Sequence, residues 1–204
     1  MPPIPPRAST AHSEAQRERI LAAARELFAS EGYEAVSMRK IARMIDQSPT
    51  TIYLYFRDKR ELVTCISEEF FAHLVAALQK EVEAAASHGP REALERGLRC
   101  YIRVALAYPS HYRAGLLNPM PIGEAREIEQ GAMSRAAQSF LVGAVARVLP
   151  PGTPPEQIAA TANACWAALH GLVAVLIIAP TCFGATAETT IEAMVSLIAN
   201  GLTP

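Results

Sequence analysis

The chain has 204 residues, long enough for one large domain or two small ones, and half of them are hydrophobic, so a substantial core is available. A formal net charge of −1 at pH 7 excludes a polycation as a whole. Residues 1–62 carry ten Arg and Lys against eight Asp and Glu, a slight basic excess that by itself supports little. Alanine and leucine are abundant over long spans and strand-like alternation is scarce, so we predict an all-α protein.

Residues 1–13 are rich in proline and polar residues and are predicted to be disordered. They contain no apolar h-region, so they are not typical of a secretory signal. The four cysteines are widely spaced, and no CxxC pair or Cys/His cluster indicates zinc or a disulfide scaffold. We therefore expect a reduced, cytoplasmic protein in which each cysteine is a small buried hydrophobe rather than an oxidant sensor.

Residues 14–31 predict a helix, because apolar side chains recur at i, i+4, i+7 and i+8 from Ile20 onward. Gly32 is well placed to end this helix as its C′ residue. A short second helix is expected to begin near Ser37, which can act as its N-cap. Its apolar side chains share one face, and its basic side chains point elsewhere.

Residues 50–56, TTIYLYF, consist of residue types that prefer strands. A strand would need a partner strand, and neither neighbouring segment offers one. The preceding residues are turn-forming, with Ser48 able to cap a helix and Pro49 suited to its first position. We therefore predict a short helix that has Ile52 and Phe56 on its inner face. The side chains expected to point outward are those of Thr50, Thr51, Leu54 and Tyr55.

One long helix is predicted over residues 59–86, because Asp58 can cap it and apolar residues recur about every four positions from Leu62. Further helices are expected at 91–107, 110–117, 123–149, 155–179 and 186–201, with prolines between them. The most apolar run, residues 165–179, is short for a membrane span and suits a buried helix better.

Two short helices that are joined by a tight turn and packed on a preceding helix form the helix-turn-helix layout, whose second helix enters the major groove of DNA. Such a helix needs hydroxyls, apolar groups for thymine methyls and nearby cations for phosphates. The outward side chains supply hydroxyls and an apolar group, and the cations are Arg39, Lys40, Arg57, Lys59 and Arg60. The alternative, a structural three-helix subdomain that touches no DNA, would leave this outward set unexplained.

The segments RILAAARELFASEGYEAVSMRKIA and SPTTIYLYFRDKREL together resemble the N-terminal domain of the TetR family of transcriptional regulators, over about residues 17–63. The family's LFxxxGY, S-x-R-x-IA, T-x-Y-x-(Y/H)-F and K-x-x-L patterns occur in order. Asp46 departs from them, since it stands where the turn usually has glycine, but aspartate tolerates left-handed geometry better than most residues. The resemblance implies homodimers, a roughly palindromic operator, and DNA contacts at Ser37, Met38, Arg39, Pro49, Thr50, Thr51, Tyr53, Leu54, Tyr55 and Lys59.

Residues 166–172, WAALHGL, resemble a TetR-type regulatory-domain group with a WxxxHGL pattern. In the family such a domain encloses a small-molecule pocket, and its last two helices pair with a second subunit. The residues agree, because 155–179 is apolar nearly all round and 186–201 carries an apolar stripe. The candidate pocket residues are Cys100, Tyr101, Arg103, His111, Tyr112, Met120, Trp166 and His170. Ordinary packing is the alternative for each of them, and a hydrogen-bonded core histidine is favoured over a metal ligand for His170.

We therefore expect a disordered tail at 1–13, a helix-turn-helix DNA-binding domain at 14–62 and a ligand-binding and dimerisation domain at 63–204. The predicted function is that of a DNA-binding transcriptional regulator, most simply a repressor that a small apolar effector releases from its operator. No nucleophile elbow, Walker loop, GxGxxG motif or zinc-ligand pair indicates an enzyme, and we expect no catalytic residue, metal or cofactor. An effector-independent regulator, an activator, and a helical binding module with a vestigial DNA-binding head stay open.

Overall fold

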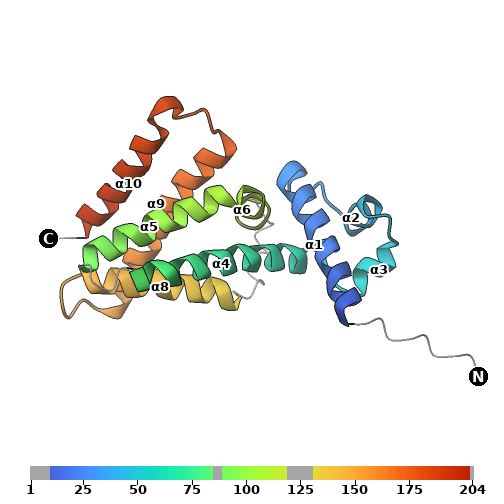
Figure 1. The fold of residues 1–204 in the computed structure, drawn as a ribbon, viewed down its shortest axis with the longest axis horizontal. Helices are drawn as coiled ribbons and strands as arrows, with labels where there is room; N and C mark the ends of the chain where they lie inside the picture. The colour runs from blue at the N-terminus through green and yellow to red at the C-terminus, as the bar shows by residue number, and fades with distance from the viewer. Residues whose placement is uncertain (1–9, 85–88, 119–130, 203–204) are drawn as a thin grey trace, which may run out of the picture. The chain divides into compact units, whose positions relative to one another are not determined.

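The computed structural model describes residues 10–84, 89–118 and 131–202 and contains no strand in that part of the chain (Figure 1). The prediction of an all-α protein is thus confirmed, and the strand interpretation of residues 50–56 is excluded. The helices are α1 (Thr10–Glu31), α2 (Met38–Met44), α3 (Pro49–Tyr53), α4 (Lys59–Ala84), α5 (Pro90–Ala107), α6 (Pro109–Leu116), α8 (Ala132–Val148), α9 (Pro155–Ile178) and α10 (Ala187–Gly201), with a 3-10 turn, η1 (Gly184–Thr186), before the last.

Most predicted helices are found within one or two residues of their expected bounds. The exception at the start is α1, which begins at Thr10, inside the segment predicted to be disordered. Residues 1–9, and the part of the predicted helix at 123–149 that precedes residue 131, lie outside the described residues.

The chain forms two compact units. The first contains the residues up to Ser67 and takes in a second segment that starts at Arg113, and the other unit contains the rest. The two boundaries that lie among the described residues fall inside helices, one within α4 and one within α6.

The first unit is built on an apolar core to which α1, α2, α3 and the beginning of α4 all contribute. Ile52 and Phe56 are 0% and 1% exposed, which confirms that they form the inner face of the third helical segment. Its other large side chains that are fully buried are Ile20, Leu21, Phe28, Tyr33, Ile41, Leu62 and Ile66. Burial of this set is the main term that stabilises the unit, because each large apolar side chain contributes roughly 1.5–3 kcal/mol when it leaves water.

The second segment of this unit completes the end of α1. Asn118 accepts a hydrogen bond from the backbone N–H of Tyr33 at 3.2 Å and donates to the carbonyl of Phe28 at 3.3 Å. Gly32 ends α1 with a φ of 84°, and its N–H donates to the same Phe28 carbonyl at 3.1 Å. Asn118 therefore gives the Phe28 carbonyl a second donor and supplies an acceptor for the Tyr33 N–H just past the end of the helix.

The starts of α2 and α3 are fixed by serine caps, as the sequence predicts. Ser37 accepts from the N–H of Lys40 at 3.2 Å, and Ser48 accepts from the N–H of Thr51 at 3.1 Å. Pro49 occupies the first turn of α3. Asp46 adopts a φ of 53°, the left-handed conformation that glycine would supply at no steric cost.

The second unit packs α5 against α8, α9 and α10. Its α8 begins with a side-chain cap from a distant helix, because the carboxylate of Glu68 on α4 accepts from the N–H groups of Met133 at 2.8 Å and Ser134 at 3.0 Å. A Cβ at Gly131 would lie 2.0 Å from the Cδ of Glu68, so the close approach of this carboxylate depends on glycine. A negative charge at this position also complements the dipole of α8.

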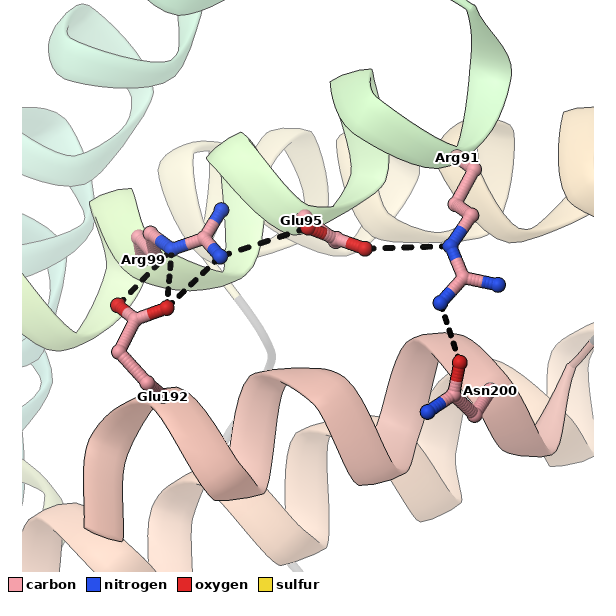
Figure 2. Close-up of polar contacts among 5 residues, drawn as sticks. All are labelled: Arg91, Glu95, Arg99, Glu192 and Asn200. Carbon is pink, nitrogen blue, oxygen red and sulfur yellow. Dashed lines mark hydrogen bonds and ion pairs between the residues drawn. The ribbon is translucent and has the colours of Figure 1, made fainter. Parts of the chain in front are cut away.

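Polar side chains join α5 to α10 (Figure 2). Arg99 donates from Nε to both carboxylate oxygens of Glu192 at 3.0 and 3.1 Å, and Glu95 lies between Arg99 and Arg91. Arg91 also donates to Asn200. Because these groups are partly exposed, each pair contributes only about 0–1 kcal/mol, and the network mainly fixes the register of the two helices.

Candidate nucleic-acid interface and interior cavity

The outer face of α3 presents large side chains to solvent. Tyr53 is 55% exposed and Leu54 is 78% exposed, while Ile52 between Thr51 and Tyr53 is fully buried. Thr50 is exposed, and Pro49 and Thr51 are half-buried. Tyr55 differs from the expectation of an outward side chain, because it is half-buried and packs against the core of the first unit. An exposed Tyr-Leu pair anchored by a buried isoleucine is thus the prominent feature of this surface.

The predicted contacts on α2 divide into exposed and buried residues. Ser37 and Arg39 are exposed, although the Ser37 hydroxyl already serves as the helix cap. Met38 is 7% exposed and belongs to the core of the first unit, so its side chain packs inward and leaves only its backbone near the surface. Lys40 forms an ion pair with Glu31, which reduces its availability for a phosphate.

Lys59 has a structural role that sequence reasoning missed. Its Nζ donates to the carbonyls of Tyr33 at 3.0 Å and Val36 at 3.4 Å, and it lies 4.1 Å from the centroid of the Tyr33 ring. An ammonium group has three donors, so one remains for another acceptor. Lys59 ties the start of α4 to the loop after α1, and its contact with a phosphate stays a prediction.

The second unit contains a cavity of about 610 Å³ between α4, α5, α8 and α9. Of the candidate pocket residues, Tyr101 and Trp166 line it. The others among the described residues do not: Cys100, Arg103, His111, Tyr112 and His170. Met120 lies outside the described residues. Sequence reasoning missed the apolar wall supplied by α4, namely Phe71, Leu74, Leu78 and Val82.

A hydrogen-bonded chain lies beside this cavity. The Tyr101 and Tyr112 hydroxyls are 2.8 Å apart, and the Tyr112 hydroxyl is 2.7 Å from Nδ1 of His170. Trp166 stacks on His170 with ring centroids 5.1 Å apart. Burial raises the pKa of Tyr101 to about 12 and also raises that of Tyr112, so both hydroxyls remain protonated. One consistent assignment therefore has Tyr101 donating to Tyr112, and Tyr112 donating to a neutral His170.

This chain predicts a pH dependence of stability. Burial lowers the pKa of His170 below its ordinary value of 6.5, so the folded state binds this proton less readily than the unfolded state. The stability that neutral His170 contributes to the folded state is complete above pH 6.5. It is lost as the pH falls below 6.5 through the lowered folded-state pKa of His170. Unfolding midpoints in urea should therefore decrease from pH 7.5 to pH 5, and the variant His170→Gln should show a shallower decrease. Equal slopes for both proteins would contradict the assignment.

The described residues give little indication of a metal-binding site or of cysteine chemistry. No group of three or more His, Cys, Asp and Glu side chains in that part of the chain could hold a metal ion. Cys100 and Cys165 are buried, as predicted, but Cys65 is only half-buried and Cys182 is exposed. The prediction that every cysteine is buried is therefore wrong, because Cys182 lies in the turn between α9 and α10 instead of on a packed helix face.

The helix α9 is long and apolar enough to cross a membrane by length and hydropathy alone. Within the second unit it packs against α5, α8 and α10, and 39% of its most apolar window is buried, so the expectation of a buried helix holds for only part of its surface.

Models of known protein families match residues in both units. A model described as "Bacterial regulatory proteins, tetR family" matches residues 20–65, and one described as "Tetracyclin repressor-like, C-terminal domain" matches residues 94–198, which is half of the chain. The chain belongs to the TetR family. The description of the first model makes this TetR protein a bacterial regulatory protein.

Relatives of this TetR protein carry regulatory names. It is 37% identical to the HTH-type transcriptional repressor KstR of Mycolicibacterium smegmatis over 111 residues, 53% of this chain and 48% of that one. It is 36% identical to the HTH-type transcriptional regulator UidR of Escherichia coli K12 over 67 residues, 33% of this chain and 34% of that one. The alignments span less than half the length of these curated relatives.

Solved structures show the same fold over nearly the whole chain. The TetR regulator PfmR of Thermus thermophilus is 24% identical with a TM-score of 0.63, covering 92% of this chain and 97% of that one. A TetR regulator of Shewanella sp. PV-4 is 19% identical with a TM-score of 0.67, covering 93% and 98% of the two chains. At these identities the likeness concerns the fold alone.

Proposed function

We propose that this regulator is a repressor that binds a palindromic operator as a homodimer and is released when a small, mainly apolar effector enters the cavity of its second unit. The observation that carries the proposal is the exposed Tyr53-Leu54 pair on a helix whose opposite side is fully buried. Apolar and aromatic groups that are exposed side by side are typical of an interaction surface. The name of KstR, a repressor, supports the direction of regulation.

The DNA-binding surface that we propose contains the positions implied by the family motifs. Tyr53, Leu54 and Thr50 are the exposed side chains of the recognition segment, and they would meet base edges and thymine methyls. Ser37, Arg39 and Lys59 would contact phosphates. The remaining positions would act through backbone groups or by setting the geometry: Met38, Pro49, Thr51 and Tyr55.

Exposed apolar residues on the last two helices support the homodimer. Val175, Ile178 and Leu197 are 36%, 64% and 69% exposed in a single chain. Exposed small residues, such as Ala167 and Gly171, lie on the same side of α9 as Val175, where they permit a close helix approach. A second copy of the chain would remove these groups from water, and a palindromic operator would match its two-fold symmetry.

The proposed release mechanism uses α4. This helix starts in the DNA-binding unit and supplies Phe71, Leu74 and Leu78 to the cavity wall in the second unit. An effector shifts the equilibrium only if it binds one conformation more tightly than the other. We propose that it favours a position of α4 in which the two heads of the dimer no longer match successive major grooves.

Replacing Leu54 by alanine should weaken binding to the promoter region of the protein's own gene by roughly 1–3 kcal/mol, because an apolar contact with DNA is lost while nothing buried is disturbed. Fluorescence anisotropy with a labelled promoter fragment at fixed salt measures the change. Leu106→Ala is the matched control, since Leu106 is 40% exposed on α5 in the second unit. Equal affinities for the two variants would remove Leu54 from the interface.

The same binding measurement, combined with a transcription assay from the promoter, distinguishes the alternatives. Promoter binding that no cavity ligand changes would indicate an effector-independent regulator, and stronger transcription upon binding would indicate an activator. If specific DNA binding is absent altogether, the head is vestigial and the protein is a helical binding module. We place the regulator in the cytoplasm, where its operator is found.

A further inference from the structure

We infer that the effector is an elongated amphiphile with an apolar body and a single negative charge at the end that lies near Arg147. This inference rests on the proposed use of the cavity as an effector site and adds the chemical class of the ligand. It follows from the shape of the cavity and from the charges on its wall.

The cavity is extended along the helices of the second unit. Its wall on α4 runs from Phe71 to Val82, about 16 Å at the helical rise, and its wall on α8 runs from Ser134 to Arg147, about 20 Å. Figure 1 shows the C-terminal ends of α4 and α8 at the same end of the second unit, so the two walls share that end. A cavity of about 610 Å³ with this form suits a long ligand better than a compact one.

The middle and the far end of the cavity offer few polar partners. The hydroxyls of Ser134 and Ser139 donate to carbonyls of their own helix segment at 3.0 and 2.9 Å. Tyr101 is already hydrogen-bonded to Tyr112. Two amide side chains, those of Gln138 and Asn163, also line the cavity, and the other walls are apolar or small, including Phe71, Leu98 and Leu169. The body of the ligand must therefore be mainly apolar, since a buried polar group without a partner costs free energy.

The charged end of the cavity has an excess of positive charge. Glu81 lines it, but its two carboxylate oxygens accept from Arg103 at 2.7 Å and Arg96 at 3.0 Å. These hydrogen bonds hold the pKa of Glu81 below its ordinary value, so the carboxylate stays ionised and compensated. Arg147, in the last turn of α8, lines the same end and has no ion-pair partner among the described residues. A ligand therefore meets an uncompensated guanidinium, which binds a carboxylate or another oxyanion through paired N–H groups.

Three probes with one alkyl chain and different end groups test this inference: decanoate, decan-1-ol and decylammonium. Trp166 is the only tryptophan of the chain and lines the cavity, so its fluorescence reports binding to the full-length protein directly. Below the micelle range at pH 7.5, decanoate should bind at least about tenfold more tightly than decan-1-ol, and decylammonium more weakly than both. The preference for decanoate should fall as salt is raised.

Arg147→Gln should abolish the preference for decanoate and leave the affinity for decan-1-ol unchanged. Arg135→Gln on the same helix is the matched control, because Arg135 is exposed, as Arg147 is, but does not line the cavity. The inference is overturned if decan-1-ol binds as tightly as decanoate, if Arg147→Gln keeps the preference, or if none of the probes binds.

Adding the promoter fragment separates this inference from the proposed function. Decanoate that binds selectively without affecting the DNA complex would support the ligand class and contradict release. Release by decan-1-ol and decanoate alike would support release and contradict the ligand class.

Discussion

Replacing Phe56 by alanine should lower the free energy of unfolding of the first unit by about 3–5 kcal/mol and thereby abolish DNA binding. Phe56 is 1% exposed, is part of the core of this unit, and carries the Arg17 guanidinium 5.0 Å from its ring centroid. Its removal leaves a cavity directly behind the recognition segment. Hydrogen exchange measures the effect, because amides of α1 and α2 should lose protection while those of α9 keep theirs.

Leu54→Ala is the control for this prediction. Leu54 is 78% exposed, so its truncation should leave hydrogen exchange unchanged and reduce only the affinity for DNA. A Phe56→Ala protein with normal protection of α1 and α2 would mean that the core of the first unit is not organised around this ring.

The largest expected effect in the second unit comes from Tyr112→Ala, which should reduce the stability of that unit by about 3–5 kcal/mol. Tyr112 is fully buried, its ring meets Phe70 edge-on at 5.2 Å, and its hydroxyl bonds both Tyr101 and His170. The substitution removes the ring and leaves the buried Tyr101 hydroxyl and the half-buried His170 imidazole without this partner. Urea unfolding monitored by Trp166 fluorescence measures this loss of stability, because Trp166 lies in the second unit.

Tyr112→Phe separates the ring from the hydroxyl. It keeps the edge-on contact with Phe70 but deprives Tyr101 and His170 of a hydrogen-bond partner, which should cost about 1–3 kcal/mol. A phenylalanine variant as stable as the original protein would show that the hydroxyl chain contributes nothing to folding.

The positions of the helices could be predicted because local chemistry fixes them. Ser37, Ser48 and Gly32 take the capping and terminating roles that their residue types favour. Ile52 and Phe56 face the core because the helical period places them together, even though residues 50–56 favour strands by composition. Tertiary burial outweighs such weak intrinsic preferences, which span only about 1 kcal/mol.

The functional surfaces were less accessible to sequence reasoning, because they depend on contacts between distant segments. Met38 falls on a motif position but packs into the core, and Lys59 bonds two carbonyls of a loop far away in sequence. The cavity is lined by side chains that look like ordinary core residues, such as Leu74 and Leu78, and nothing in their pattern reveals that the space beside them is empty. Packing density is a property of the assembled helices.

The route of the chain between its two units limits how the protein can be cut or recombined. The first unit is discontinuous, since Ala114 lies in its core and Asn118 bonds the end of α1. A fragment ending at Ser67 would lack both residues. A chimera joined at Ser67 would place its junction inside a helical turn of α4. An exchange of the first unit between related genes therefore has to transfer both of its segments together. It must also preserve the helical register of α4 and α6 at the junctions.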